Sequence, residues 1–346
     1  MRHQRKEWVR LSWKRPWQVV MRRRDFLTFL AGLTTWPIGA HAEQSAIPTV
    51  GFLSSLSAAA LIGPVAAFRD GLQSVGYTEG KNVEIEFRWA DGRYDRLPAL
   101  AAELVARQVT VIVTVGGDPP AFAAKAASTT IPIVFMVGRD PVELGLVRSL
   151  SRPSSNATGI NLLITEMESK RIELIEQLAP TSKVLAVFVN PKNADADVQL
   201  KAIQSAAHTL NERIKIFNVS SEVELENAFA NFKKDDIGGF ALVADPFFVN
   251  RRDQIISSAA RGRFPGIYFL REFAESGGLV SYGSDLAEAY RQAGVYAGKI
   301  LSGAKPNDLP VVQPTKFDLV INLKTAKVLG ITVPASLLAI ASRVIE

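Results

Sequence analysis

Two kinds of hydrophobic pattern alternate along most of this chain. Short runs of consecutive apolar residues, such as VTVIVTV at 109–115, are typical of parallel strands buried on both faces. Between them, apolar residues recur every three or four positions, as in a helix that packs on a sheet by one face. Strands are predicted at 48–53, 83–89, 109–115, 131–137, 157–161, 184–189, 214–219, 240–244, 266–270 and 317–323. Helices are predicted at about 58–75, 94–107, 144–150, 169–178, 196–210, 222–232, 250–261, 286–300, 324–329 and 334–340, with one more opened by Pro119 or Pro120.

Strands that alternate with helices predict parallel, right-handed β-α-β units. The helical pattern breaks at 152–156, where we expect the chain to cross from one half of the molecule into the other. A Gly-rich segment at 277–283 predicts a second crossing, and 306–314 reads as an extended connection. The chain has 346 residues, enough for two domains. The predicted fold class is therefore α/β, with two Rossmann-like parallel-sheet lobes joined by crossing segments. One lobe comprises 47–160 with 284–310, and the other 161–280 with 315–346.

Polar residues and glycines follow several of the predicted strands. In open α/β sheets, ligands bind at the carboxyl ends of the strands. The serines at 54–57 could cap the next helix or contact a ligand at its N-terminus. Asp-Pro pairs, as at Asp245-Pro246, are also ordinary turn and cap chemistry. No GxGxxG or P-loop pattern is present, so no nucleotide site is predicted.

Net charge divides the chain into two parts. The whole chain carries +6, but residues 1–42 hold nine Lys/Arg and two Asp/Glu, which leaves about −1 for 43–346. The body has no cationic excess to attract a nucleic acid. The absence of cysteine excludes disulfides and thiolate metal sites. Only His208 lies in the body, where its helical pattern favours a surface position, so neither a histidine-based metal site nor a cofactor is predicted.

The first 42 residues read as an export signal. RRRDFL at 22–27 contains the R-R-x-F-L core of a twin-arginine signal. An apolar stretch at 26–40 follows, and Ala40-His41-Ala42 fits the cleavage rule. That stretch is shorter than the ~20 residues of a membrane span. We expect cleavage after Ala42 and a periplasmic protein with no lipid anchor, and Met21 is an alternative start.

Several long segments together resemble one known family. They are IPIVFMVGRDPVELGLVRSLSRPSSNATG, LVADPFFVNRRDQI, REFAESGGLVSYGSDLAEAYRQAGVYAGKILSGAKPNDLPVVQPTKFDLVINLKTAKVLG and ITVPASLLA. Collinear over about 47–346, they are similar to ABC-transporter substrate-binding proteins of the type I periplasmic-binding-protein fold, some of which bind aromatic amino acids. The chain differs where relatives show Pro-Gly-Gly-Asn, here 153–156, and at Arg139, where a small residue is common.

The resemblance implies two lobes that close on a small ligand, with strand-end loops lining the cleft. It implies ABC permease subunits as partners, a monomer, and no catalytic residues. The implied ligand-binding residues are Ser54, Ser55, Ser57, Gly117, Asp118, Arg139 and Asp140 from one lobe, Asn190 and Asp245 from the other, and Asn161 and Tyr282 on the crossings.

The ligand expected from these residues is an amino acid or a related zwitterion. Arg139 would hold the carboxylate and Asp245 the ammonium group. In the alternative, Arg139 points into solvent and Asp245 caps the next helix. Two other functions stay open. The same fold could serve as a sensory module of a membrane signalling protein, or an enzyme could use Asp118, Asp140 and Asp245, although the one body histidine, His208, is expected at the surface and not in a Ser-His-Asp set.

Overall fold

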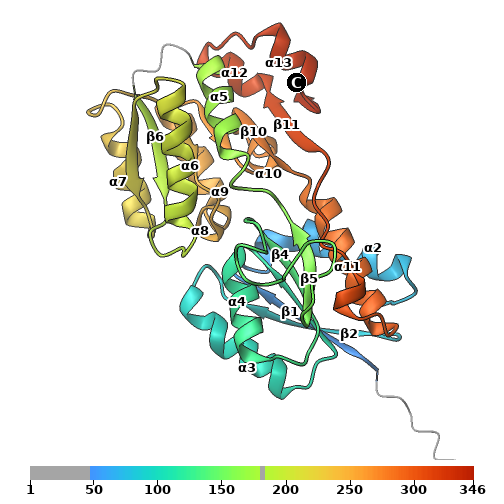
Figure 1. Ribbon diagram of the computed structural model, residues 1–346. Helices are drawn as coiled ribbons and strands as arrows, with labels where there is room; N and C mark the ends of the chain where they lie inside the picture. Colours follow the sequence, from blue (N-terminus) through green and yellow to red (C-terminus); the bar gives the residue numbers. More distant parts are fainter. Residues whose placement is uncertain (1–46, 180–183) are drawn as a thin grey trace, which may run out of the picture. The chain divides into compact units, whose positions relative to one another are not determined.

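The computed structural model describes residues 47–179 and 184–346, which form two open sheets (Figure 1). The first sheet has five parallel strands in the order β2-β1-β3-β4-β5. The second has seven, in the order β12-β11-β10-β9-β8-β6-β7. The first sheet contains β1 (Thr49–Ser54), β2 (Glu84–Trp89), β3 (Val111–Val115), β4 (Ile133–Val137) and β5 (Ala157–Asn161). The second contains β6 (Val184–Val189), β7 (Ile214–Asn218), β8 (Ile237–Leu242), β9 (Gly266–Tyr268), β10 (Val280–Ser284), β11 (Phe317–Asn322) and β12 (Arg343–Ile345).

Helices cover both faces of each sheet. We call the first sheet with its helices lobe 1, and the second sheet with its helices lobe 2. In lobe 1, one face packs on α2 and α11 and the other on α3 and α4. In lobe 2, α5, α6, α12 and α13 lie on one face and α7, α8, α9 and α10 on the other. The helices are α2 (Ile62–Ser74), α3 (Leu97–Ala106), α4 (Asp118–Ala127), α5 (Glu168–Leu178), α6 (Ala196–Thr209), α7 (Glu222–Asn231), α8 (Pro246–Asn250), α9 (Arg252–Gly262), α10 (Arg271–Glu275), α11 (Leu286–Leu301), α12 (Leu323–Leu329) and α13 (Ala335–Ile340), with short 3-10 turns η1 (Ala59–Leu61), η2 (Tyr94–Arg96) and η3 (Pro306–Asp308). The α/β fold class with two sheet lobes is thus confirmed.

The helix predicted at 144–150 does not form. The segment folds into turns around Gly145, whose φ of +66° belongs to the left-handed region. Leu146 and Val147 both donate their backbone N–H to the carbonyl of Pro141 instead of continuing a helical ladder. The helical spacing was misleading because these apolar side chains simply face the core of lobe 1.

The crossing predicted at 277–283 lies directly after this segment, between β10 and α11. This segment ends in β10, which pairs parallel with β9 and antiparallel with β11 inside the second sheet. The second sheet therefore departs from the all-parallel expectation, and the chain leaves it only after β10. The helix predicted at 250–261 forms as α9, and a short helix that was not predicted, α8, precedes it with Arg251 between the two. Neither α10 nor β12 was predicted, because five and three residues are too short to show a period.

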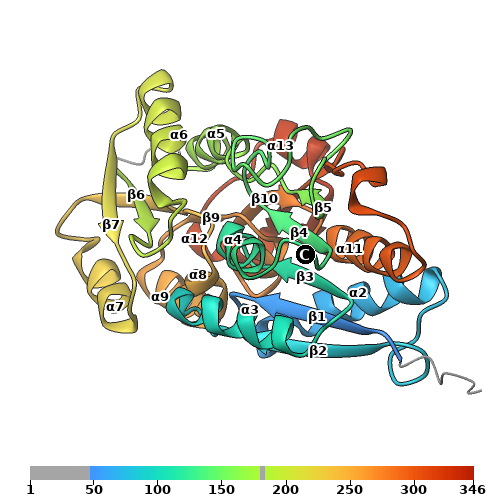
Figure 2. The ribbon, with the colours of Figure 1, turned by 60° about the horizontal axis from the view of Figure 1, so that its bottom comes forward.

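The contact between α2 and α11 fixes α11 on lobe 1, although its sequence follows β10 of lobe 2. The two helices lie side by side in both views (Figures 1 and 2). Glycine on each helix permits the approach: a Cβ on Gly71 would lie 2.0 Å from the carbonyl oxygen of Arg291. A Cβ on Gly294 would lie 2.1 Å from that of Phe68. This packing holds the first turn of α11 at the boundary with lobe 2.

The connections between the lobes are bound to one another. Arg171 of α5 is buried and donates to the carbonyl oxygens of Ile164 (2.9 Å) and Tyr282 (3.1 Å), which lie on or beside two different connections. It also pairs with Glu168 at 2.6 Å. The hydroxyl of Ser284 donates to the carbonyl of Leu162 at 2.7 Å. We call Arg171 and Glu168 the hinge pair.

Candidate functional site

A cavity of about 80 Å³ lies between the two lobes. One water needs roughly 10–15 Å³ by this measure, so the cavity has room for several waters or a small organic group. Its lining comes from loops that follow β1, β3, β4, β6, β8 and β9, from the 162–165 connection, and from the first turns of α6 and α11. The carboxyl ends of strands in both sheets thus meet at one place, as expected for open α/β sheets.

Most of the lining is apolar. These side chains belong to Leu56, Met136, Leu162, Ile164, Ala244, Pro246, Val249, Phe269, Leu270, Leu286 and Tyr290. They come from both lobes and from a connection between them, so an apolar body placed here would lose contact with water on several sides.

The polar end of the cavity is organised by Arg139. Its Nε lies 2.9 Å from Asp118 Oδ2 of lobe 1, and its Nη2 lies 2.7 Å from Asp195 Oδ1 of lobe 2. Asp118 also accepts a hydrogen bond from the backbone N–H of Gly138 at 2.7 Å. The side chains of Asp118 and Asp195 are only 1% and 6% exposed. We call Arg139, Asp118 and Asp195 the charge triad, and it bridges the two lobes.

Asp195 has a strongly shifted acidity. Burial, together with the nearby negative charge of Asp118, raises its pKa to about 7, against the opposing effect of Arg139. Two carboxylates that share one guanidinium are not fully neutralised by it. The triad therefore carries surplus negative charge whenever Asp195 is ionised.

Asp245 lies at the start of α8, with all its accepting positions in use. Its Oδ1 accepts from Asn190 Nδ2 (2.9 Å) and from the backbone N–H of Phe247 (2.8 Å). Its Oδ2 accepts from Asn193 Nδ2 (2.8 Å) and from the Tyr94 hydroxyl of lobe 1 (2.6 Å). Burial raises the pKa of Asp245, whereas these hydrogen bonds act to lower it. Burial and the charge of Asp245 raise the pKa of Tyr94, so the phenol stays protonated and donates.

Besides Asp195 Oδ1, which is ion-paired with Arg139, two lining residues hold buried oxygen atoms with no hydrogen-bond partner. They are Oε1 of Gln199, a side chain on the buried face of α6, and Oγ1 of Thr165 on the 162–165 connection. The amide nitrogen of Gln199 donates to the carbonyl of Ala244 at 3.3 Å, which fixes the orientation of the amide and leaves Oε1 free to accept.

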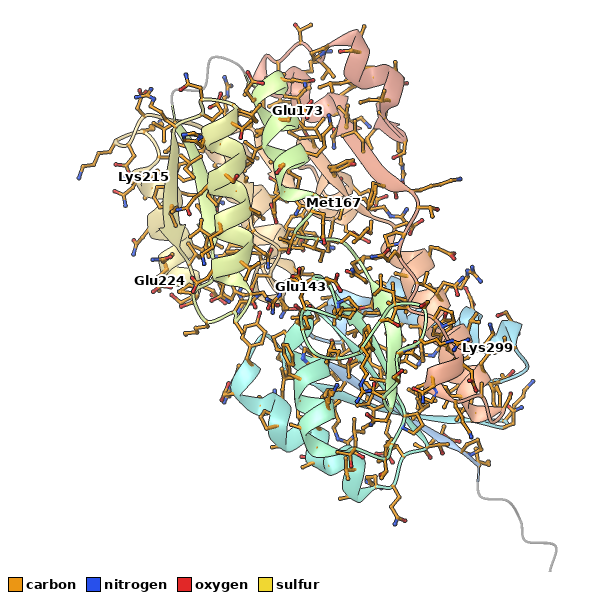
Figure 3. All side chains as sticks on the ribbon, viewed as in Figure 1. Glu143, Met167, Glu173, Lys215, Glu224 and Lys299 are labelled. Carbon is orange, nitrogen blue, oxygen red and sulfur yellow. The ribbon has the colours of Figure 1, made fainter. Side chains whose placement is uncertain are left out.

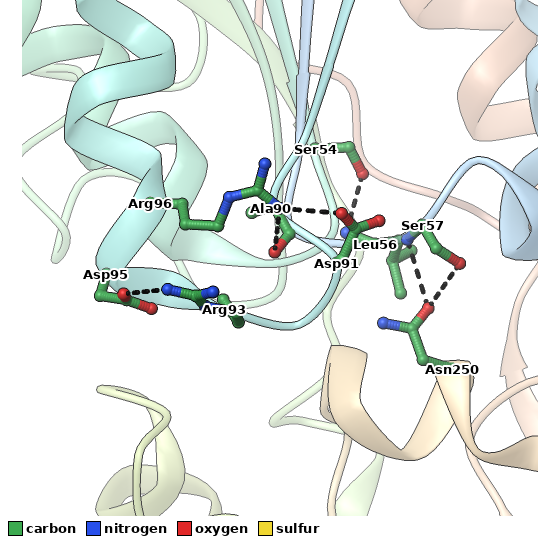
Figure 4. Close-up of polar contacts among 9 residues, drawn as sticks. All are labelled: Ser54, Leu56, Ser57, Ala90, Asp91, Arg93, Asp95, Arg96 and Asn250. Carbon is green, nitrogen blue, oxygen red and sulfur yellow. Dashed lines mark hydrogen bonds and ion pairs between the residues drawn. The ribbon is translucent and has the colours of Figure 1, made fainter.

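A larger groove of about 740 Å³ lies on the other side of the Tyr94–Asp245 bond, lined by Tyr94, Asn190, Phe247 and several charged residues. Figure 4 shows ion pairs on its lobe 1 side, Arg93–Asp95 at 3.0 Å and Arg96–Asp91 at 2.8 Å. In the same view, the backbone N–H and hydroxyl of Ser57 donate to Asn250 Oδ1 of lobe 2 at 3.2 and 3.0 Å. The cationic side chains shown here are thus already paired.

Four predicted site residues line the cavity: Gly117, Asp118, Arg139 and Asp245. Of the others, Asn190 binds Asp245, and Ser57 binds Asn250 beside the groove. Ser54 and Asn161 each accept a bond from the backbone two residues on, as does Asp140. Ser55 is fully buried away from the lining, and Tyr282 packs on Phe317. The serines at 54–57 do not cap α2, whose N-terminus has no side-chain cap.

The expected pairing of ligand groups needs correction. Arg139 neither points into solvent nor stands free for a ligand carboxylate, because Asp118 and Asp195 hold it. Asp245 does cap α8, as the alternative stated, and its oxygens are occupied by four donors from the chain itself.

The sequence reasoning missed four of the seven polar side chains in the lining. Asn193, Asp195 and Gln199 follow the strand end at Asn190-Pro191, and their position at the start of a helix was the available signal. Tyr94 and Thr165 carried no recognisable pattern. As predicted, His208 is exposed. Within 47–179 and 184–346, no cluster of His, Asp and Glu could hold a metal ion, and no helix has the length and apolarity of a membrane span. The predicted export signal lies outside the described residues.

Comparison with known proteins identifies a family and several relatives that this chain resembles. The sequence profile described as "ABC transporter substrate binding protein" matches residues 49–345. The "Tyrosine-binding protein" of Clostridioides difficile (strain R20291) is 27% identical over 263 residues, which are 76% of this chain and 75% of that protein.

Solved structures that are similar over most of the chain include the following two. A conserved domain protein of Vibrio cholerae O1 biovar El Tor superposes with a TM-score of 0.78 at 28% identity, covering 86% of this chain and 99% of that one. An ABC domain from Streptococcus pneumoniae, crystallised with L-Trp, has a TM-score of 0.76 at 25% identity and the same coverage.

Proposed function

Because the chain belongs to the family of ABC transporter substrate-binding proteins, we propose that it captures an amino acid or a related compound between its lobes and delivers it to an ABC importer. The observation that carries the proposal is the cavity, which both lobes line with an apolar wall and a polar end. Binding and release leave the molecule unchanged, and permease subunits are the partners. The protein acts as a monomer and without nucleic acid.

The moving parts proposed are the two lobes, 47–160 with 284–310 and 161–280 with 315–346. Bonds such as Tyr94–Asp245 and Arg139–Asp195 join the lobes across the cavity, and the hinge pair joins the connections at their base. A ligand that contacts both lobes shifts the open–closed equilibrium by its preference for the closed form.

Equilibrium dialysis tests this function. Purified protein from 47 onward is dialysed against a culture extract, and the compounds retained are identified by mass spectrometry. We expect one small organic compound to be enriched and, at saturation, to compact the protein in small-angle scattering. Denatured protein serves as the control. Enrichment of nothing, or saturation without compaction, would contradict the proposed function.

Export is proposed along the twin-arginine route, with cleavage after Ala42 and release into the periplasm. Replacing Arg23 and Arg24 by Lys should keep the precursor in the cytoplasm, because the export receptor reads the arginine pair. Cell fractionation and immunoblotting measure this. Exchanging Arg10 for Lys, upstream of the motif, is the matched control. Normal periplasmic yield from the double variant would show that the motif is not used.

A further inference from the structure

The cavity has little to offer a ligand carboxylate. Among the described residues of its lining, Arg139 is the one cation, and two carboxylates already bind it. To hold a ligand carboxylate, Arg139 would have to release Asp118 or Asp195. Either carboxylate is nearly inaccessible to water, and an unpaired buried charge is strongly unfavourable.

The same lining has a surplus of hydrogen-bond acceptors. Its acidic and basic side chains are three carboxyl groups, Asp118, Asp195 and Asp245, and one guanidinium, with the neutral phenol of Tyr290 beside them. Asp245 is saturated by four donors from the chain. Gln199 Oε1, which can only accept, and Thr165 Oγ1, a hydroxyl that can accept or donate, have no hydrogen-bond partner. A buried acceptor without a donor is costly, so the group that enters this end should donate.

These acceptors are close together in the fold. Gln199 follows Asp195 by four residues, and its backbone N–H donates to the Asp195 carbonyl at 3.1 Å, so the two side chains share one face of the first turn of α6. Thr165 faces the same cavity from the connection between the lobes. A protonated amine has three donors and a positive charge, and this set of acceptors suits it.

The surroundings of the charge triad reinforce the selection against acids. Glu166 lies next to Thr165 in the chain. Its pKa is raised by burial and then by the charges of Asp140, Glu143 and Asp118. Glu143 lies on the side of lobe 1 that faces lobe 2 (Figure 3). Carboxylates of both lobes therefore concentrate negative potential at this end of the cavity.

We propose that the cavity selects a protonated amine on an apolar body and rejects molecules with a free carboxylate. The amino group binds Asp195, Gln199 and Thr165, and the body packs among Met136, Leu162, Ile164 and Phe269. Compounds of this class are amines and amino-acid amides. This inference rests on the proposed solute-binding function and narrows its ligand.

Matched probe sets test the selection by calorimetry on the exported form, residues 43–346. One set is 2-phenylethylamine, L-phenylalanine amide, L-phenylalanine and 3-phenylpropanoate, and equivalent sets carry an indole or an isobutyl body. Within the set whose body fits, the amine and the amide should bind at least about tenfold more tightly than the amino acid, and the acid should not bind. Tighter binding of the amino acid or the acid would overturn the inference.

If none of the probe compounds binds, the compound retained in the dialysis against culture extract tests the inference. Retention of an amine without a carboxylate supports the inference. Retention of a carboxylate compound overturns it but leaves the solute-binding function standing. Retention of nothing overturns that function, and the inference with it.

Two variants test which residues determine the preference for an amine over a carboxylate. Changing Asp118 and Asp195 together to Asn frees Arg139, so the double variant should gain binding of the amino acid or acid probe and lose affinity for the amine. Gln199→Leu should weaken amine binding by about tenfold while the variant stays folded, as its unfolding transition will show. Asp70→Asn, which removes an exposed carboxylate on α2, is the control. If the double variant does not fold, Asp195→Asn alone must reduce the amine-over-acid preference. An unchanged preference would refute the assignment.

Discussion

The hydrogen bond between Tyr94 and Asp245 joins η2 of lobe 1 to the start of α8 in lobe 2 at 2.6 Å. Tyr94→Phe removes only the donor and keeps the ring. Because Asp245 retains three other donors, it is not left unsatisfied, and the variant should report the bond across the lobes with little secondary damage.

The size of the effect follows from the acceptor. A hydrogen bond to a charged group contributes about 1.5–3 kcal/mol. The lower end applies here because the buried carboxylate of Asp245 keeps its three other hydrogen bonds in the variant. About 1.4 kcal/mol corresponds to a factor of ten in an equilibrium constant. Tyr94→Phe should therefore shift the open–closed equilibrium of the lobes about tenfold toward the open form.

Ligand dissociation is the sensitive assay, because opening precedes release. Stopped-flow with the compound retained in dialysis should show an off-rate about tenfold higher and an on-rate that changes little. Tyr77→Phe is the matched control, since the Tyr77 hydroxyl pairs with Ser302 at 3.3 Å inside lobe 1. A wild-type off-rate and wild-type scattering for Tyr94→Phe would refute the view that this bond stabilises closure.

Three further changes test the packing and charges. Folded Asp195 has a pKa near 7, above its usual 3.8, so its contribution to stability is present below about pH 4 and lost as the pH rises through 7; Asp195→Asn should flatten this part of the curve of unfolding temperature against pH, and an unchanged slope would count against the assignment. Gly294→Ala places a methyl group 2.1 Å from the Phe68 carbonyl and should lower the free energy of unfolding by about 1–3 kcal/mol in urea titrations, whereas Gly303→Ala, with open space around it, should not act by a clash. Arg171→Met leaves Glu168 buried and unpaired and should cost about 3–5 kcal/mol by the same measurement, while Arg93→Met, which removes a partner from a fully exposed pair, should leave the free energy of unfolding unchanged; equal losses would show that the hinge pair has no special role.

Hydrophobic periodicity was sufficient for most of the fold, because the same apolar faces that produce the pattern are buried between sheet and helix. It failed at 144–150, where a left-handed Gly145 stops the helix although the apolar spacing continues. It also failed at β10, because the order and direction of strands depend on partners far away in the sequence, here β9 and β11.

The site was predictable in position but not in chemistry. Residues at strand ends had to gather at one edge, and Gly117, Asp118, Arg139 and Asp245 do so. Whether such a residue is free for a ligand depends on what the opposite lobe brings to it. Asp195 reaches Arg139, and Tyr94 reaches Asp245, across gaps in the sequence that no local pattern encodes.

The bonds that join the two lobes have a consequence for how often empty receptors would dock on the permease. Tyr94–Asp245, Ser57–Asn250 and Arg139–Asp195 favour closure whether or not cargo is present. A permease that recognises the closed shape would then also meet empty receptors, and each such encounter occupies a docking site unproductively. Stronger bridges close a larger fraction of the empty receptors, and these compete with loaded receptors for the permease. More receptor copies must then carry a ligand for uptake to proceed. The strength of the bridges therefore sets the ratio of receptor to permease at which import saturates.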